Sequence, residues 1–255
     1  IKKKIKSNKI CLTFDDGIKS QKKLILPILD RLNIKAFFFI YTSILKGETD
    51  NLEYFRDFRC LSYKKIDTFY KDFYLNLKKI FPQKEKELYL KYNEKYLINY
   101  KFYTKEDRKF RFCRDIILNT REYNVIAEKM MKAKKYRKKD RKKQLFMNIS
   151  DIKEISEKGH TIGLHSHSHP TKIDKLDYKV QYKEYSKSKK ILEKILKKKV
   201  WAMSHPCGNY NNNSLKILNK IGIKIGFRSN LSIKENASIL EVPREDHTDI
   251  LKKLK

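Results

Sequence analysis

The chain has 255 residues, enough for one domain with a substantial core or for one domain that carries a large insertion. A composition of 40% hydrophobic and 36% charged residues excludes a disordered chain. No apolar run reaches about eighteen residues, which excludes a transmembrane helix. The net charge of +31 has two explanations, an anionic partner or compositional drift in a chain encoded by AT-rich DNA, so charge alone names no partner.

The cysteines are scattered and form no CxxC pair; they are Cys11, Cys60, Cys113 and Cys207. Four isolated thiols favour a reducing compartment over a disulfide framework. We therefore expect a cytoplasmic protein, free or at the membrane surface. The chain begins at Ile1 instead of Met, so an exported, longer form stays open.

The first segment has the rhythm of a parallel strand–helix–strand unit. Residues 8–14 form a short apolar run, typical of a buried strand, which ends at the turn signal Asp15-Asp16-Gly17. Residues 19–32 have apolar side chains at helical spacing, and residues 36–41 form an aromatic, β-rich run. This order predicts a βαβ unit.

The stretch from about residue 46 to 146 has a different character, with many Lys, Tyr and Phe and almost no Gly. Helices are predicted over 62–80, 84–100 and 119–143, so we interpret this stretch as a helical insertion into a single domain that spans 1–255. The end of the last helix is very basic. Such a tail is ordinarily a solvated helix end; the alternative is contact with an anionic polymer or a membrane surface.

The alternation of strands and helices returns after the insertion. The predicted helices are 151–158, 178–198 and 213–221, and the predicted strands are 161–164, 200–203, 223–227 and 238–242. Polar clusters follow four of the predicted strands, namely Asp15-Asp16, His165 to His169, Ser204 to Gly208, and Arg244. Because active sites of parallel α/β folds form at the carboxyl ends of strands, these clusters predict one site.

Three histidines lie in the hexapeptide 165–170. Two histidines and one carboxylate form a common catalytic zinc shell that leaves a position for water. Imidazole and carboxylate ligands also suit iron, cobalt or nickel. A histidine-rich loop with adventitious metal affinity is the alternative, and the Asp-Asp pair on an earlier strand end weakens it. Because successive side chains diverge in an extended segment, one aspartate can bind metal while its neighbour accepts a proton.

Two motifs carry a family resemblance. Residues 12–17, Leu-Thr-Phe-Asp-Asp-Gly, resemble the first motif of the polysaccharide deacetylase family, the NodB-homology or carbohydrate esterase 4 group. Residues 159–170 resemble its second motif, in which the first and last histidine of a His-(Ser/Thr)-x-x-x pattern bind metal. The resemblance covers about 8–45 and 147–246 and leaves out the insertion.

The resemblance implies an α/β fold, a distorted (β/α) barrel with fewer than eight strands and here a large helical insertion. It assigns a divalent metal, zinc before cobalt, nickel or iron, to Asp16, His165 and His169. It assigns the role of catalytic base to Asp15. The implied reaction is hydrolysis of an acetyl group, usually an N-acetyl, from a sugar in a polysaccharide or glycoconjugate.

The third motif departs from the family pattern. It reads Ser204-His205-Pro206-Cys207-Gly208, without the arginine that orients the base in the family. We expect Arg244 to pair with Asp15 in its place. The family places an oxyanion-binding N–H in this motif, which here belongs to Cys207, beside Gly208.

The late histidine that acts as general acid in the family is not evident. His205 and His247 are candidates, and His205 is equally well explained as a structural hydrogen-bond donor. His167, between the two ligands, is expected to line the substrate pocket.

An enzyme acting on an acetylated carbohydrate is therefore the first hypothesis, with an O-deacetylase as a close variant. A degenerate, inactive module that binds an anionic polysaccharide is the second. A nucleic-acid partner is not expected, since no recognised motif supports one.

Overall fold

The computed structural model describes residues 10–47, 51–98, 103–229, 231 and 237–253. The chain divides into two compact units. One unit, here called the sheet unit, comprises 1–50 and 143–255. The other, here called the helical unit, comprises 51–142.

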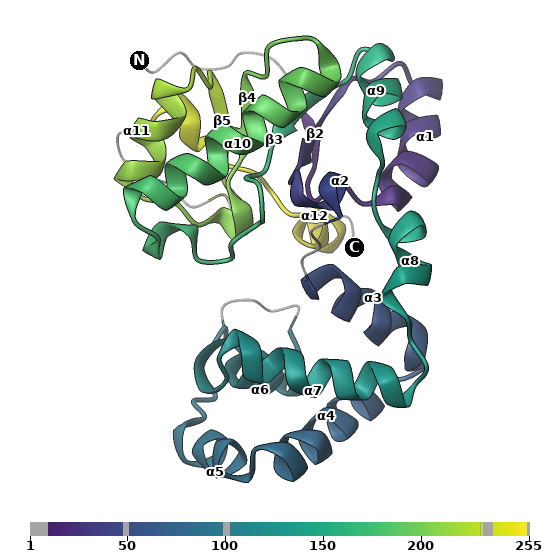
Figure 1. The fold of residues 1–255 in the computed structure, drawn as a ribbon, viewed down its shortest axis with the longest axis vertical. Helices are drawn as coiled ribbons and strands as arrows, with labels where there is room; N and C mark the ends of the chain where they lie inside the picture. Colours follow the sequence, from purple (N-terminus) through teal and green to yellow (C-terminus); the bar gives the residue numbers. More distant parts are fainter. Residues whose placement is uncertain (1–9, 48–50, 99–102, 230, 232–236, 254–255) are drawn as a thin grey trace. The chain divides into compact units, whose positions relative to one another are not determined.

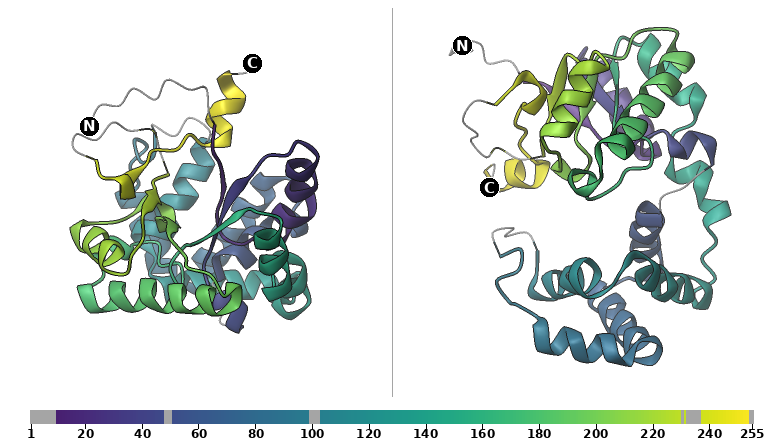
Figure 2. Two further views of the ribbon diagram at one scale, coloured as in Figure 1. Left: turned by 90° about the horizontal axis from the view of Figure 1, so that it is seen from above. Right: turned by 60° about the vertical axis from the view of Figure 1, so that its left-hand side comes forward.

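The sheet unit is built on five parallel strands in the order β1-β2-β3-β4-β5. The strands are β1 (Leu12–Phe14), β2 (Ala36–Ile40), β3 (Thr161–Leu164), β4 (Ala202–Ser204) and β5 (Ile225–Phe227). A single parallel bridge joins Phe227 to Val242 beyond β5. The sheet is curled, as Figure 2 shows from above. Every strand therefore delivers its carboxyl end to the same rim.

Helices lie along the outer side of the curled sheet (Figure 1). The longer ones are α1 (Leu26–Arg31), α9 (Ile149–Glu157), α10 (Tyr178–Leu196) and α11 (Asn212–Lys220). The short elements of this unit are η1 (Gln21–Ile25), α2 (Ser43–Lys46), η3 (Ile173–Lys175), η4 (Pro206–Gly208), η5 (Ile239–Glu241) and α12 (His247–Lys253). Both α9 and α10 pack on β3.

One side of the sheet carries a buried apolar cluster. Phe39, Ala202 and Phe227 form a buried cluster, against which Phe37 and Val242 pack. Gly163 of β3 makes room for this cluster, because a Cβ there would lie 2.5 Å from the Phe39 ring and 2.7 Å from the Ala202 carbonyl oxygen. Close packing of this kind fixes the strands on which the polar rim is mounted.

The helical unit has its own aromatic core. Its elements are α3 (Asn51–Ser62), α4 (Ile66–Ile80), α5 (Pro82–Lys91), α6 (Lys105–Phe112), η2 (Cys113–Ile117) and α7 (Thr120–Ala133), and α8 (Lys138–Leu145) crosses its boundary. Phe110 packs edge-on to Phe69 and to Phe73, with ring centroids 5.3 and 4.9 Å apart. Leu77 and Ile126 are fully buried.

Several predicted elements differ from the observed ones. The helix expected over 84–100 ends at Lys91, and the described residues 92–98 form a turn and irregular structure. Residues 238–242 were expected as a strand, but 239–241 form the 3-10 turn η5 and only Val242 bridges to β5. The helix expected over 119–143 is broken into α7 and α8 at Lys135, which has a left-handed φ of 56°. Within the described residues, no helix combines the length and the apolar character needed to cross a membrane.

Candidate functional site

The rim of the sheet brings one carboxylate and two imidazoles together. Asp16 follows β1, and His165 follows β3 directly. The Oδ1 atom of Asp16 lies 3.4 Å from Nε2 of His165 and 3.3 Å from Nε2 of His169. One ligand atom of each residue lies within 4.8 Å of the other two, and both histidines are buried.

These spacings fit a small divalent cation. Two zinc–ligand bonds of about 2.0–2.1 Å at a tetrahedral angle separate the ligand atoms by about 3.3 Å, as found for both Asp16–histidine pairs. Nδ1 of His165 lies 2.7 Å from the Ser204 carbonyl oxygen, which fixes the tautomer and turns Nε2 toward Asp16. Asp16, His165 and His169 therefore have the donor types, spacing and orientation to hold a metal.

The backbone that carries the candidate ligands has an unusual conformation. Asp16, Ser166 and His169 have φ values of 76°, 63° and 57°, in the left-handed region that favours glycine. The His169 N–H donates to Oγ of Ser166 at 3.1 Å, which helps to hold this conformation. Such backbone strain persists only where the surroundings enforce it, and it clusters at functional sites.

Asp15 lies beside this trio and is held by an arginine. The Arg244 guanidinium donates to both Asp15 oxygens, at 2.9 and 2.8 Å, and also to Oγ1 of Thr13 at 3.0 Å. Ser204 donates its hydroxyl to Asp15 at 3.0 Å and accepts from Arg244 at 2.9 Å. The structure thus brings together Asp15 and Arg244, and it gives Ser204, which the sequence placed at this rim without a role, a contact with both.

The electrostatics of the site keep Asp15 ionised. Burial alone would raise the pKa of the Asp15 carboxyl, but nearby His165 and the hydrogen bonds from Arg244 outweigh burial and hold that pKa below its ordinary value. For His165, burial would lower the pKa, yet Asp15 and Asp16 raise it above its ordinary value. The same negative charge would stabilise a bound cation.

His205 occupies a structural position. The side chain is fully buried, its Nε2 lies 2.8 Å from the Leu240 carbonyl oxygen, and its ring stacks on Tyr210 with centroids 4.2 Å apart. Burial lowers the pKa of His205 to about 4, so the ring is neutral near pH 7 and donates Nε2–H to Leu240. A proton donor needs access to the leaving group, so this geometry favours the structural alternative over the catalytic one. The other candidate, His247, has a side chain that is 81% exposed, 3.4 Å from Asp246.

The third motif forms the tight turn η4. Cys207 has a left-handed φ of 53°, and the Gly208 N–H donates to the His205 carbonyl oxygen at 2.9 Å. The Gly208 amide therefore closes the turn, and the place expected for Gly208 beside the oxyanion site stays a prediction. The oxyanion role expected of the Cys207 amide stays a prediction.

His167 lies between the candidate ligands in sequence, and hydrogen bonds to Thr42 and Ser43 hold it in place. It is buried, and its Nδ1 lies 2.8 Å from Oγ1 of Thr42. Its backbone carbonyl oxygen accepts from the Ser43 N–H at 2.8 Å. The structure places Nδ1 of His167 toward the end of β2, so this side chain helps to anchor the loop.

Comparison with known proteins yields a family model that matches this chain. The family model described as polysaccharide deacetylase matches residues 2–58 and 119–226, more than half of the chain. Between the two matched segments it leaves out 59–118, within the helical unit, and it ends before 227–255. No curated protein matches.

Two solved structures share the fold. A Streptococcus pyogenes deacetylase, PplD, in complex with acetate, has a TM-score of 0.53 and 16% identity, covering 98% of this chain and 72% of its own. A de-N-acetylase from Aggregatibacter actinomycetemcomitans has a TM-score of 0.50 and 14% identity, covering 96% and 74%. The predicted NodB-type barrel fold and the family resemblance are thereby confirmed. This chain belongs to the polysaccharide deacetylase family.

Proposed function

We propose that this protein is a metal-dependent hydrolase that removes an acetyl group, in the first place an N-acetyl, from a sugar of a polysaccharide or glycoconjugate. The observation that carries the proposal is the spacing of Asp16 Oδ1, 3.4 and 3.3 Å from two imidazole nitrogens, beside a carboxylate paired with arginine. Family membership supplies the substrate class, an acetylated carbohydrate.

Each residue of the site has a distinct task in this proposal. Asp16, His165 and His169 would hold the cation, which when bound would polarise the acetyl carbonyl and lower the pKa of water. Asp15 takes a proton from the water as its oxygen attacks the carbonyl carbon. Arg244 orients Asp15 and keeps it ionised before attack. The Cys207 N–H is proposed to donate to the developing oxyanion.

The leaving nitrogen must gain a proton as the carbon–nitrogen bond breaks. Because His205 is buried and donates to Leu240, we assign this step to Asp15, which returns the proton that it took from water. The products are then a free amine and acetic acid, which releases its proton to solvent as acetate, and Asp15 is restored as the carboxylate. One group thus serves as base and then as acid.

The test is acetate release from N-acetylated sugar oligomers by the purified full chain. We expect release that a chelator abolishes and that zinc or cobalt restores. Release from O-acetylated but not N-acetylated sugars would identify the O-deacetylase variant. If release is absent or insensitive to chelator across a broad substrate panel, the hydrolase proposal is wrong and the inactive binding module is favoured.

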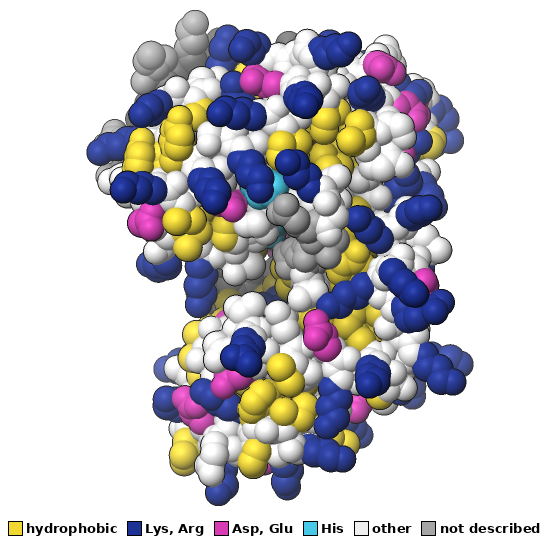
Figure 3. Space-filling model, in the orientation of Figure 1, with side chains coloured by type: hydrophobic (Ala, Val, Ile, Leu, Met, Phe, Trp, Pro, Cys, Tyr) yellow, Lys and Arg dark blue, Asp and Glu magenta, His cyan; other side chains and the backbone are white. Residues whose placement is uncertain are grey.

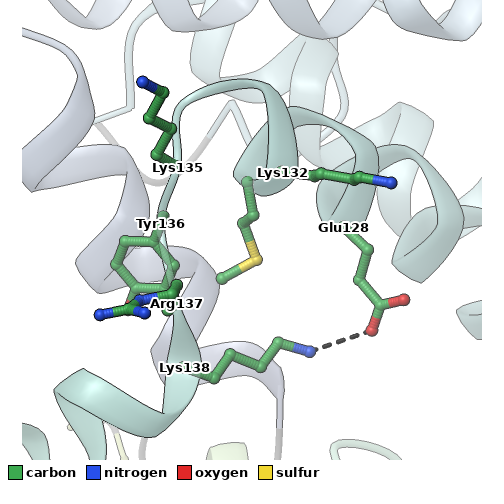
Figure 4. A pocket seen from close by; sticks show the side chains of 7 residues that line it. Glu128, Lys132, Lys135, Tyr136, Arg137 and Lys138 are labelled. Atoms are coloured by element: carbon green, nitrogen blue, oxygen red, sulfur yellow. Dashed lines mark hydrogen bonds and ion pairs between the residues drawn. The ribbon is translucent and has the colours of Figure 1, made fainter.

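We further propose that the basic end of the helical unit contacts an anionic polymer. Lys and Arg side chains are spread over the visible face in Figure 3, but their density in the sequence peaks between residues 132 and 143. An open hollow of about 310 Å³ lies in this segment, lined by Glu128, Met131, Lys132, Lys135, Tyr136, Arg137 and Lys138 (Figure 4). Among the residues drawn in Figure 4, one ion pair is marked, between Lys138 and Glu128. An excess of positive charge around a hollow favours a polyanion.

A further inference from the structure

The loop that carries both histidine ligands has no regular secondary structure of its own. It runs from His165, at the end of β3, to His169, and it includes two residues with left-handed φ, Ser166 and His169. A metal site requires its ligand atoms to be held within a few tenths of an ångström. Something outside the loop must therefore fix its backbone.

A carboxylate from helix α10 supplies such a contact. Oε2 of Glu184 accepts the backbone N–H groups of His167 at 3.0 Å and of Ser168 at 2.8 Å. Oε1 of the same carboxylate accepts the Ser168 hydroxyl at 2.8 Å. Three hydrogen bonds from two consecutive loop residues thus converge on one side chain, and hydrogen bonds to an ionised acceptor are the strong kind.

The loop is also held from the end of β2. The Ser43 N–H donates to the His167 carbonyl oxygen at 2.8 Å, and Oγ1 of Thr42 lies 2.8 Å from Nδ1 of His167. Thr42 and Ser43 are buried, so this attachment is rigid. Glu184 binds the N–H side of His167 while Ser43 binds its carbonyl, which leaves the segment between the two ligands little freedom to rotate.

We propose that Glu184 is a positioning residue for the metal site: it locks His167 and Ser168 so that the His169 imidazole meets Asp16. This inference rests on the proposed metal-dependent function. Glu184 acts through the loop backbone, and it has no role in the reaction beyond fixing the ligands. Outer contacts of this kind tune metal affinity about 10- to 100-fold.

The test measures binding of zinc alone to the full chain by isothermal titration calorimetry. Glu184→Ala is expected to lower zinc affinity about 10- to 100-fold. Glu184→Gln, which keeps one carbonyl oxygen to accept the loop amides, is expected to lose less. Cobalt loaded into Glu184→Ala is expected to show an altered visible spectrum, because the coordination geometry loosens. If Glu184 only stabilised the fold, Glu184→Ala would change neither the zinc affinity nor the visible spectrum of bound cobalt.

Glu193 offers a matched control on the same helix. Its carboxylate accepts the Val200 N–H at 3.0 Å and pairs with Lys189 at 2.8 Å. Glu193→Ala removes a comparable contact and is expected to leave zinc affinity unchanged. If Glu184→Ala does not fold, Ser168→Ala, at an exposed residue, tests the same contact and is expected to cost a few-fold in affinity.

Two results are contrary and distinguishable. If the unmodified chain binds no zinc, the proposed function fails, and this inference fails with it. If the unmodified chain binds zinc and the Glu184 and Ser168 variants bind it equally well, or no worse than Glu193→Ala, only the positioning role is overturned.

Discussion

Arg244 and Asp15 form the contact on which the proposed catalysis would depend most directly. The arginine reaches the first strand from beyond the last one, and its two nitrogens match both carboxylate oxygens. A lysine would offer a point charge instead of a planar fork, so the two residues are not equivalent at such a site.

We expect Arg244→Ala to lower kcat about 100-fold, because the base loses both its orientation and the charge that keeps it ionised. The kcat of Arg244→Lys should lie between that of Arg244→Ala and that of the unmodified protein. Zinc affinity should change little, since Arg244 contacts none of the three ligands through a hydrogen bond found here. Steady-state kinetics and calorimetry check these outcomes, and unchanged turnover in Arg244→Ala would refute the role of this residue.

His205 allows structure and catalysis to be separated. Because its Nε2–H donates to Leu240 in a fully buried site, His205→Gln, whose amide nitrogen can reach the same oxygen, should retain turnover within a few-fold. His205→Ala should lose about 1–3 kcal/mol of unfolding free energy, because a buried acceptor is left unsatisfied. Urea unfolding and kcat are the measurements. Loss of kcat by 100-fold in a stable His205→Gln protein would restore the general-acid hypothesis.

The residues of the metal trio could be predicted because their types and spacing are local motifs. Ser204 and Glu184 could not, since a serine and a glutamate mean little until the fold brings them within 3.0 Å of Asp15 and the histidine loop. A signal for Ser204 was present: it occupies the place of the family arginine. For Glu184 the sequence offered no signal beyond its position on a predicted helix.

At the scale of elements, tertiary contacts decided where the sequence prediction was wrong. The periodic pattern over 119–143 is helical, yet the helix breaks where Tyr136 packs edge-on to Phe58 and donates its hydroxyl to Asp57. Arg141 donates to the same carboxylate. A buried aromatic contact and these hydrogen bonds outweigh the small gain from continuing one helix. The last predicted strand shrank to a bridge at Val242, with Ser238 capping a 3-10 turn.

The start of α9 is fixed by a reciprocal capping box. Asn148 is the N-cap, and Asp151 closes the box by accepting the Asn148 N–H at 2.8 Å. Asp151 is 4% exposed and also pairs with Lys19 and Lys22 of the first helical segment. Although burial would raise the pKa of Asp151, the Asn148 N–H and Lys19 outweigh it and lower that pKa.

The Asp151 carboxylate therefore makes the stability of the fold depend on pH. A lowered folded-state pKa means that its stabilisation is present above the unfolded pKa of about 3.9 and is lost as pH falls through the folded value. We expect Asp151→Asn to reduce the unfolding free energy at pH 7 by about 2 kcal/mol. The difference should shrink below about pH 3.5. Urea titrations at both pH values check this, and a difference independent of pH would contradict it.

The whole molecule combines a predictable barrel with a less predictable helical unit. Alternating strands and helices, with polar residues at strand ends, specify a parallel sheet and the rim that carries the site. The helical unit has no such alternation of strands and helices in its sequence. Its elements α3, α6 and η2 were not predicted, because aromatic contacts between helices that are distant in sequence hold their apolar residues.

Charge at the surface of the helical unit can be tested without disturbing its core. Lys132, Lys135 and Lys139 are exposed side chains of the basic segment, and Lys64, Lys71 and Lys86 are exposed side chains elsewhere in the same unit. Reversing either trio to glutamate changes the net charge equally. If the segment is a binding surface, only the first reversal should weaken binding to a polyanionic polysaccharide, on the order of 10-fold at low salt.

Affinity electrophoresis in gels containing an anionic or a neutral polysaccharide gives the measurement. Retardation in the anionic gel should fall as salt rises, because exposed charges are screened within about 10 Å at 0.1 M salt. Retardation in the neutral gel should be the same for both triple variants. Anionic vesicles provide a second comparison, since binding to vesicles and not to the polymer would identify a membrane surface as the partner. Equal loss in the two triple variants would mean that net charge alone causes binding, and that the basic segment has no special role.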